Sequence, residues 1–126
     1  MPPICPYCNN SAMLIDSSEV YAGRSFGLIW ACARCDAYVG VHKDSPTYKP
    51  KGTLANKELR VWRVRAHSAF DPLWRSLLLE PKMTRTEAYT WMQETLAISR
   101  DQAHIGSLDV EGCRRLIAAI SSLETQ

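Results

Sequence analysis

Apolar residues in the first 42 positions come in short runs rather than in a helical stripe. The run from Phe26 to Cys32 alternates large and small side chains with a rough period of two, which is typical of a β-strand. Shorter apolar runs at 13–15 and 37–41 predict two further strands. The polar segment 16–23 predicts the turn that follows the first strand. The pattern therefore indicates a small unit of short antiparallel strands.

From Asn56 onward, apolar residues recur at spacings of three and four, as on one face of an α-helix. Asp71-Pro72 interrupts this stripe. Because aspartate can cap a helix and proline is tolerated in the first turn, we predict a break with an immediate restart. The residues of the stripe are Leu59, Trp62, Ala66, Ala69, Phe70, Leu73, Trp74 and Leu77.

Two further helices are predicted in the last third of the chain. Thr84 and Glu87 are three residues apart, which matches a capping box at a helix start. The helix that follows should bury Ala88, Tyr89, Met92 and Leu96. Asp109 is placed to cap the last helix. The apolar stripe of that last helix consists of Val110, Cys113, Leu116, Ile117, Ile120 and Leu123.

Four of the five cysteines form two C-x-x-C pairs, Cys5 with Cys8 and Cys32 with Cys35. One such loop brings two sulfurs within reach of one ion, and two loops complete the tetrahedral shell of four thiolates that zinc accepts. The separation between the pairs is slightly longer than in most zinc ribbons, but a hairpin with a polar turn accommodates it. We therefore predict one structural Zn²⁺ per chain.

The predicted metal should stabilise the fold, because four ligands leave no position for a catalytic water. Two alternatives stay open at this stage. One pair of cysteines could form a dithiol redox centre. Three cysteines could also bind zinc together with His42. Cys113 falls on an apolar helical face, which favours a buried core thiol over a ligand.

These patterns predict an α+β fold with three parts: a zinc-ribbon module at 1–42, a basic linker at 43–55, and a helical module of three to four helices at 56–126. The linker is predicted from two prolines, a glycine and scattered lysines. Metal binding and folding of the first module should be coupled, because roughly 40 residues of short strands bury little core.

Charge is distributed unevenly along the chain, although the net charge is only +2. Residues 1–42 have a net charge of −1, residues 43–85 of +6, and residues 86–126 of −3. No stretch approaches the roughly 18 continuous apolar residues of a membrane span. The first residues lack the regions of a signal peptide. We expect a cytoplasmic protein that does not enter a membrane.

The basic surplus in the middle third favours a polyanionic partner. On the predicted helix, Arg60, Arg63 and His67 share one flank, because they are three and four residues apart. A merely solvated helix face and a patch for an acidic protein stay open as alternatives. The predicted nucleic-acid contacts, with either DNA or RNA, are Arg34, Lys43, Lys49, Lys51, Lys57, Arg60, Arg63 and His67. If exposed, three tyrosines of the ribbon are suited to stacking on bases: Tyr7, Tyr21 and Tyr38.

Two histidine–aspartate pairs are the candidates for catalytic chemistry. His67 and Asp71 are four residues apart on a predicted helix, and His104 and Asp109 form a second pair. A histidine oriented by a carboxylate can act as a general base. However, no activated nucleophile, glycine-rich phosphate loop or catalytic-metal motif accompanies either pair in the sequence. Helix capping explains both aspartates, so we expect no enzyme activity.

Five segments resemble a small zinc-finger-containing family of tailed phages and prophages: 5–8, 29–40, 54–60, 65–74 and 104–106. The similarity covers nearly the whole chain. It implies a phage or mobile-element accessory protein that works in the bacterial cytoplasm. Such proteins often bind nucleic acid or block a host protein.

One departure from the family pattern is the run Leu77-Leu78-Leu79, which stands where a more polar turn is expected. Exposed, it would form a contact surface; buried, it would complete the helical core. Together, the residues and the resemblance predict a non-enzymatic zinc-ribbon protein that binds nucleic acid through the basic helix and loop. The alternative is a protein-interaction module that inhibits or redirects a host defence or transcription protein.

Overall fold

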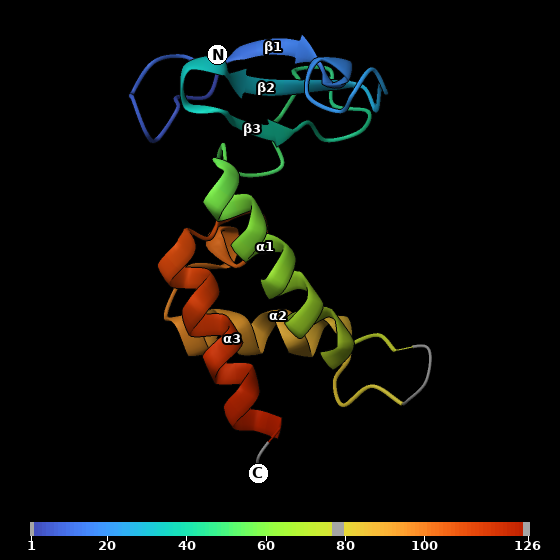
Figure 1. Cartoon of the computed structure of the whole chain (residues 1–126). Helices are drawn as coiled ribbons and strands as arrows, with labels where there is room; N and C mark the ends of the chain where they lie inside the picture. The colour runs from blue at the N-terminus through green and yellow to red at the C-terminus, as the bar shows by residue number, and fades with distance from the viewer. Residues whose placement is uncertain (1, 77–79, 125–126) are drawn as a thin grey trace. The chain divides into compact units, whose positions relative to one another are not determined.

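A computed structural model divides the chain into two compact units, Met1–Lys57 and Glu58–Gln126 (Figure 1). It describes residues 2–76 and 80–124. The first unit contains a three-stranded sheet and the second contains the helices, so the α+β prediction is confirmed. The predicted run Leu77-Leu78-Leu79 lies outside the described residues.

The sheet consists of β1 (Met13–Asp16), β2 (Leu28–Cys32) and β3 (Ala37–Gly40), hydrogen-bonded in that order with antiparallel neighbours. The central strand is therefore the one that carries the alternating apolar run. β2 and β3 fall within the segments where the sequence predicts strands, and β1 extends one residue beyond the predicted segment 13–15, to Asp16. The first two residues of the predicted second strand, Phe26 and Gly27, lie outside β2.

The register of the sheet assigns each side chain to one of two faces, because neighbours along a strand alternate and directly paired residues share a face. Ala31 pairs with both Met13 and Tyr38, which places these three on one face. Cys32 pairs with Ala37 on the other face. The buried cluster of the unit contains the residues of that second face and of the loops packed on it: Cys5, Ala12, Cys32, Ala37, Val39 and Leu54.

The segment 43–55, predicted as a linker, belongs to the sheet unit. Its residues form isolated bridges with β3 and its continuation, Ala55 with Tyr38 and Pro50 with Val41. Leu54 is fully buried and Ala55 is 2% exposed. The apolar pair at the end of the segment therefore completes the core of the unit, and the two bridges hold the segment beside β3.

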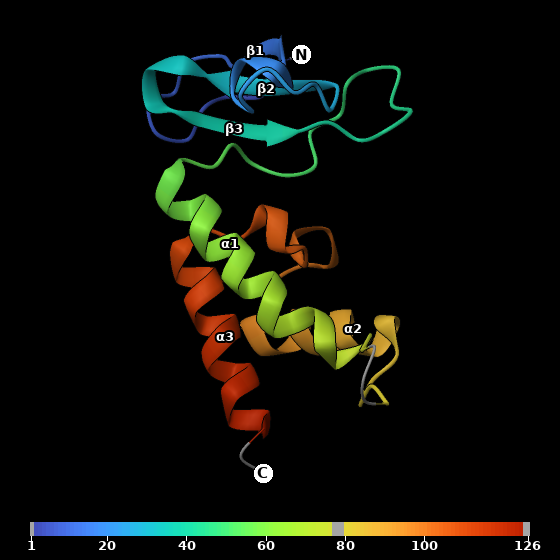
Figure 2. The same cartoon turned by 45° about the vertical axis from the view of Figure 1, so that its right-hand side comes forward.

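The second unit contains α1 (Lys57–Phe70, which starts on the last residue of the first unit), α2 (Arg85–Leu96) and α3 (Val110–Glu124). Three short 3₁₀ turns, Asp71–Leu73, Arg100–Gln102 and Ile105–Ser107, connect them. In Figures 1 and 2, α2 runs across α1 and α3. None of the helices in the described part of the chain is long and apolar enough to cross a membrane.

The helical core follows the predicted stripes. Its fully or nearly fully buried side chains include Leu59, Ala66, Phe70, Leu73, Ala88, Met92, Leu96, Cys113, Leu116 and Ile120. Cys113 is 0% exposed, which agrees with its prediction as a core thiol. Two guanidinium groups, those of Arg65 and Arg114, each lie 4.9 Å from the ring centroid of the half-buried Trp62.

The helix caps agree with the sequence in two of three places. Thr84 Oγ1 accepts the Glu87 N–H and Glu87 Oε1 accepts the Thr84 N–H, which completes the predicted capping box of α2. Asp109 Oδ1 accepts the Gly112 N–H at 2.7 Å, in the first turn of α3. Asp71 differs, because Phe70 occupies the cap position of the 3₁₀ turn and the Asp71 carboxylate binds neighbouring side chains instead.

Candidate metal centre and basic surfaces

The first C-x-x-C pair lies on a tight loop. The Cys5 N–H donates to the Asn10 carbonyl and the Asn9 N–H donates to the Cys5 carbonyl, both at 2.8 Å. Asn9 is in the left-handed region with φ 62°, a conformation that asparagine adopts more readily than most residues. This reversal directs the Cys8 side chain back toward Cys5.

The second C-x-x-C pair forms the turn between β2 and β3. Cys32 is the last residue of β2, Ala33–Cys35 form a 3₁₀ turn, and β3 starts at Ala37. Asp36 reverses the chain with φ 50°, and its N–H donates to the Ala33 carbonyl. Because Cys35 lies in this turn, its sulfur is brought close to the Cys32 sulfur.

The four sulfurs of these loops converge. All four lie within 4.8 Å of one another, and the sulfurs of Cys8 and Cys32 are 3.7 Å apart. A tetrahedron with Zn–S bonds of about 2.3 Å has S···S edges of about 3.8 Å. The cysteines are free thiols rather than disulfides. The spacing therefore fits one tetrahedral zinc ion held by Cys5, Cys8, Cys32 and Cys35.

Electrostatics among the thiols also favours a cation. The Asn10 backbone N–H stabilises the Cys8 thiolate and lowers the pKa of that thiol to about 7. Partial desolvation, followed by hydrogen bonding with neighbouring thiols, raises the pKa of Cys35 to about 12. Ionisation of the Cys8 thiol is therefore favoured, whereas ionisation of the Cys35 thiol is disfavoured. A divalent cation among the sulfurs would stabilise both thiolates, and four thiolate ligands suit zinc.

The four-sulfur geometry differs from both alternatives that the sequence leaves open. His42 lies after β3 and its N–H donates to the Lys49 carbonyl, whereas four cysteine sulfurs already supply a complete tetrahedron. A dithiol redox centre uses one C-x-x-C pair, whereas here the sulfurs of both pairs form one cluster. The geometry therefore supports the four-cysteine site.

Comparison with known proteins places this geometry in a family. The model of a family described as a zinc-finger-containing domain matches residues 1–123. The chain belongs to this family. The match covers both the four-cysteine sheet unit and the helices, so the family comprises the two units together. No curated protein and no solved structure matches the chain.

Five of the eight predicted nucleic-acid contacts lie in the zinc unit, by which we mean Met1–Lys57. All five side chains are exposed: Arg34, Lys43, Lys49, Lys51 and Lys57. Backbone hydrogen bonds fix two of them beside β3. The Lys51 N–H donates to the Gly40 carbonyl at 2.9 Å, and the Lys49 carbonyl accepts the His42 N–H at 2.8 Å.

The other three predicted contacts lie on α1 in the helical unit, Glu58–Gln126. Arg60 and Arg63 are half-buried and His67 is exposed. Arg63 Nε and Nη2 both donate to the Leu108 carbonyl, at 3.1 and 3.0 Å. This bidentate contact joins α1 to the turn before α3, so it gives Arg63 a structural role.

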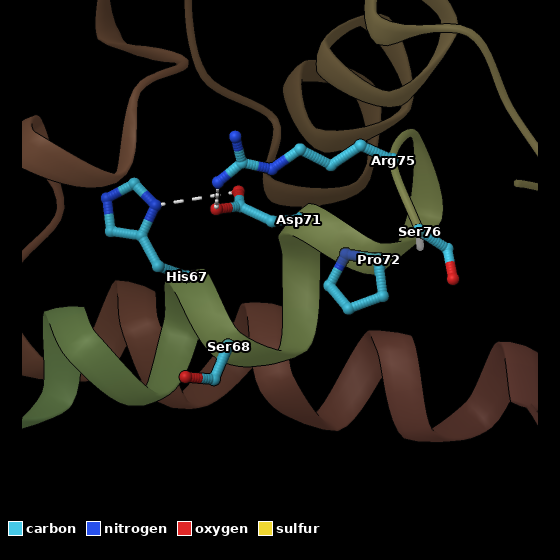
Figure 3. Close-up of a pocket in the computed structure, with 6 residues that line it drawn as sticks. All are labelled: His67, Ser68, Asp71, Pro72, Arg75 and Ser76. Carbon is cyan, nitrogen blue, oxygen red and sulfur yellow. Dashed lines mark hydrogen bonds and ion pairs between the residues drawn. The ribbon is translucent and has the colours of Figure 1, made fainter. Parts of the chain in front are cut away.

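His67 and Asp71 face each other at the end of α1, as their spacing predicts. His67 Nδ1 is 3.6 Å from Asp71 Oδ1, and Arg75 Nη2 is 3.1 Å from Asp71 Oδ2. Figure 3 shows the imidazole and the guanidinium on either side of the Asp71 carboxylate, at an open hollow of about 540 Å³. Ser68, also in its lining, points away from the pair. The arrangement satisfies the charge of Asp71 through i,i+4 pairs and presents no activated nucleophile beside His67.

The second histidine–aspartate pair is separated by its local contacts. The His104 ring lies 5.9 Å from the Tyr89 ring, whereas Asp109 binds the backbone of α3. Among the described residues, no hydrogen bond or ion pair joins His104 to Asp109. The capping explanation of Asp109 therefore accounts for this residue.

The sequence predicts only some of the exposed aromatic rings on the zinc unit. Tyr7, Tyr21 and Tyr48 are 42%, 40% and 45% exposed, and Tyr38 is half-buried. Phe26 is 73% exposed and was missed, because the sequence pattern assigned it to a strand. The available sequence clue was Gly27, which follows Phe26 with φ 103° and ends the loop before β2.

Proposed function

We propose that this zinc-finger-containing protein is a non-enzymatic nucleic-acid-binding module. The observation that carries the proposal is the lysine segment, residues 43–57, which has four lysines and one aspartate. Three of the four lysines lie within nine positions, and all four side chains are exposed. Bridges to β3 and the buried Leu54 and Ala55 hold the segment against the zinc unit.

A fixed array of lysines is suited to the phosphate backbone. Each lysine that neutralises a phosphate releases a condensed counterion, so affinity rises with the number of contacts and falls with salt. Because the segment is hydrogen-bonded to β3, less conformational entropy is lost when it meets a polyanion than for a free linker. The metal supports this role indirectly, since Cys32 and Cys35 hold the β2–β3 turn on which Arg34 lies.

The basic residues of α1 form a second and separate candidate surface. Arg60 and His67 lie on the same helix flank as predicted, but two N–H donors of Arg63 are directed to the Leu108 carbonyl. We therefore assign the larger share of phosphate contact to the lysine segment. A four-thiolate metal site has a structural role, and Asp71 and Asp109 are engaged in an ion pair and a helix cap. Both observations support a binding function over catalysis.

Binding can be measured by fluorescence anisotropy with labelled single- and double-stranded DNA and RNA at 50 and 200 mM salt. We expect micromolar or tighter affinity that falls steeply with salt. Reversing two charges with Lys49→Glu and Lys51→Glu should weaken binding at least tenfold. The matched control reverses two exposed charges of the helical unit, Lys82→Glu and Arg115→Glu, and should weaken binding less. The absence of salt-sensitive binding to any of these probes rejects the proposal.

A protein partner is the second candidate, favoured by exposed valines on α1. Val61 and Val64 are 45% and 65% exposed. Apolar side chains presented on a helix flank are suited to a protein groove. A host defence or transcription protein of a phage-infected bacterium stays the predicted partner. Stoichiometric retention of one such protein, lost on Val64→Asp with the fold intact, supports this second function.

A further inference from the structure

One face of the zinc unit's sheet carries aromatic rings instead of the metal. Cys32, Ala37 and Val39 lie on the face that packs around the sulfurs. Tyr38 lies on the opposite face, paired with Ala31, and Gly40 shares that face two residues later. The loop between β1 and β2, residues 17–27 (Figure 1), reaches the face of Tyr38, because Tyr21 of this loop contacts the Tyr38 ring.

Hydrogen bonds of Asp16 and Ser17 stabilise that loop. Ser17 is fully buried, and its Oγ accepts the Phe26 N–H at 2.6 Å. The Ser17 N–H donates to the Gly27 carbonyl at 2.9 Å. Asp16 accepts the Ser18 N–H and the Ser25 hydroxyl. These bonds close the loop at its base, so the backbone of Phe26 has a defined position although its ring is exposed.

The loop presents its rings in a connected array. The Tyr21 and Phe26 rings meet edge to face with centroids 5.4 Å apart, and the Tyr21 and Tyr38 rings do so at 5.9 Å. Tyr38 forms the half-buried base, and Phe26 is 73% exposed. A phenylalanine held this far in solvent by a fixed backbone contributes little to the core. Its exposed ring is available for a ligand.

A cation lies beside the same face. A Cβ built on Gly40 would lie 3.5 Å from the Lys51 side-chain Cδ, so the lysine stem covers the Gly40 position on the face of Tyr38. The Lys51 side chain is exposed. Aromatic rings beside a lysine are complementary to bases beside phosphates. Exposed rings next to a lysine cation therefore favour a nucleic-acid strand as the ligand of this face.

We infer that Phe26 and Tyr21 form a stacking platform for unpaired bases and that the preferred ligand is single-stranded nucleic acid. The inference rests on the proposed function and narrows its ligand. In a duplex, the faces of the bases are occupied by neighbouring base pairs, so a stacking platform adds affinity for a single strand only. Lys51 holds the backbone of the same strand.

The inference is tested with a labelled 15-nucleotide oligothymidine and a 15-base-pair duplex, titrated with the full-length zinc-loaded protein. Phe26→Ala should weaken binding to the single strand about 5- to 150-fold, the loss typical of one stacked base. Binding to the duplex should change less than twofold. Phe26→Trp keeps an aromatic ring at this position, so it should retain single-strand affinity. The fluorescence of the introduced tryptophan should be quenched when the single strand binds. Tyr48→Ala removes another exposed ring of the unit and serves as the matched control.

The possible failures are distinguishable. If the wild-type protein binds neither probe, both the proposed function and the inference are rejected. If the wild type binds but Phe26→Ala leaves single-strand affinity unchanged, or weakens both probes equally, the stacking platform is rejected while nucleic-acid binding stands. If Phe26→Ala affects only the retention of a host protein, the aromatic face is a protein-docking surface and the inference is overturned. Zinc content and circular dichroism of each variant confirm an intact fold.

Discussion

The two units of this chain are stabilised in different ways. In the zinc unit, most buried side chains are small, and the large aliphatic residues among them are Ile29, Val39 and Leu54. The helical unit buries Phe70 and Met92 together with several leucines and isoleucines. A small sheet with such a core depends on its metal, whereas three helices with a continuous apolar core can fold without one.

The two units also differ in how they present charged and aromatic side chains. The zinc unit presents the exposed lysine segment and the exposed rings on a frame that the metal holds together. In the helical unit, several cations contact groups of the unit itself, namely a tryptophan ring or a carbonyl oxygen. The basic residues thus have different surroundings in the two units.

The largest expected effect comes from removing a sulfur ligand. Cys32→Ser should abolish zinc binding and unfold the zinc unit, because structural zinc contributes on the order of 10–16 kcal/mol in zinc-finger peptides. The helical unit should keep its circular dichroism signal. Cys113→Ala removes a thiol from the helical core instead and should retain one zinc per chain. Equal zinc content in the two variants would contradict the assignment of the ligands.

A substitution in the core of the helical unit should destabilise that unit and leave zinc binding unchanged. Phe70 is fully buried and meets the Tyr89 ring edge to face at 5.1 Å. Phe70→Ala should lower the free energy of unfolding of the helical unit by about 3–5 kcal/mol and leave the zinc content unchanged. Val64→Ala, on the exposed side of α1, should cost less than about 0.5 kcal/mol. Urea unfolding followed by circular dichroism at 222 nm measures both, and loss of zinc from Phe70→Ala would contradict independent units.

The contact of Arg63 with Leu108 should have a smaller effect on the same unit. Arg63→Met keeps much of the side-chain length but leaves the Leu108 carbonyl without its two charged donors. We expect a loss of about 1–3 kcal/mol in urea unfolding. Arg115→Met removes one charge from an exposed position of α3 and should change stability little. Equal effects of the two variants would show that the contact does not stabilise the unit.

The smallest expected effect is a pH dependence at the start of α2. The Thr84 backbone N–H donates to the Glu87 carboxylate and holds its pKa below the ordinary value of 4.5. Stability from this contact is therefore fully present above pH 4.5 and is lost as pH falls through the lowered pKa of the folded state. Glu87→Gln should remove this part of the acid sensitivity of the helical unit between pH 5 and 3.

The corresponding control is Glu94→Gln, an exposed glutamate on the same helix. It also removes one carboxylate but no capping-box partner. If both variants unfold with the wild-type pH dependence, the capping carboxylate contributes no measurable linkage. Urea midpoints of the helical unit at each pH provide the comparison.

Much of this architecture follows from local patterns in the sequence. The C-x-x-C spacing fixes which sulfurs converge, and three- and four-residue periodicity identifies the buried faces of α1, α2 and α3. The capping box at Thr84 and the cap at Asp109 are also local, since each joins residues three positions apart. Such features depend on near neighbours, so the sequence alone predicts them.

The features that differ from the prediction depend on distant residues. The 43–55 segment joins the zinc unit because Ala55 pairs with Tyr38. Arg63 binds a carbonyl 45 positions away. Phe26 leaves the predicted strand because the buried Ser17, nine positions earlier, binds its N–H. No periodicity encodes these contacts, and they decide which of the predicted basic and aromatic residues are available to a ligand.

The central claim, that one metal ion holds the zinc unit while the helical unit stands on its own core, is tested most directly by chelation. Protein purified under reducing conditions is analysed for metal, and amide spectra are recorded by NMR before and after addition of a strong zinc chelator. We predict one zinc per chain and, after chelation, collapse of the dispersed signals of residues 2–57 with the helical signals retained. A metal-free protein whose sheet signals are unchanged would contradict the account.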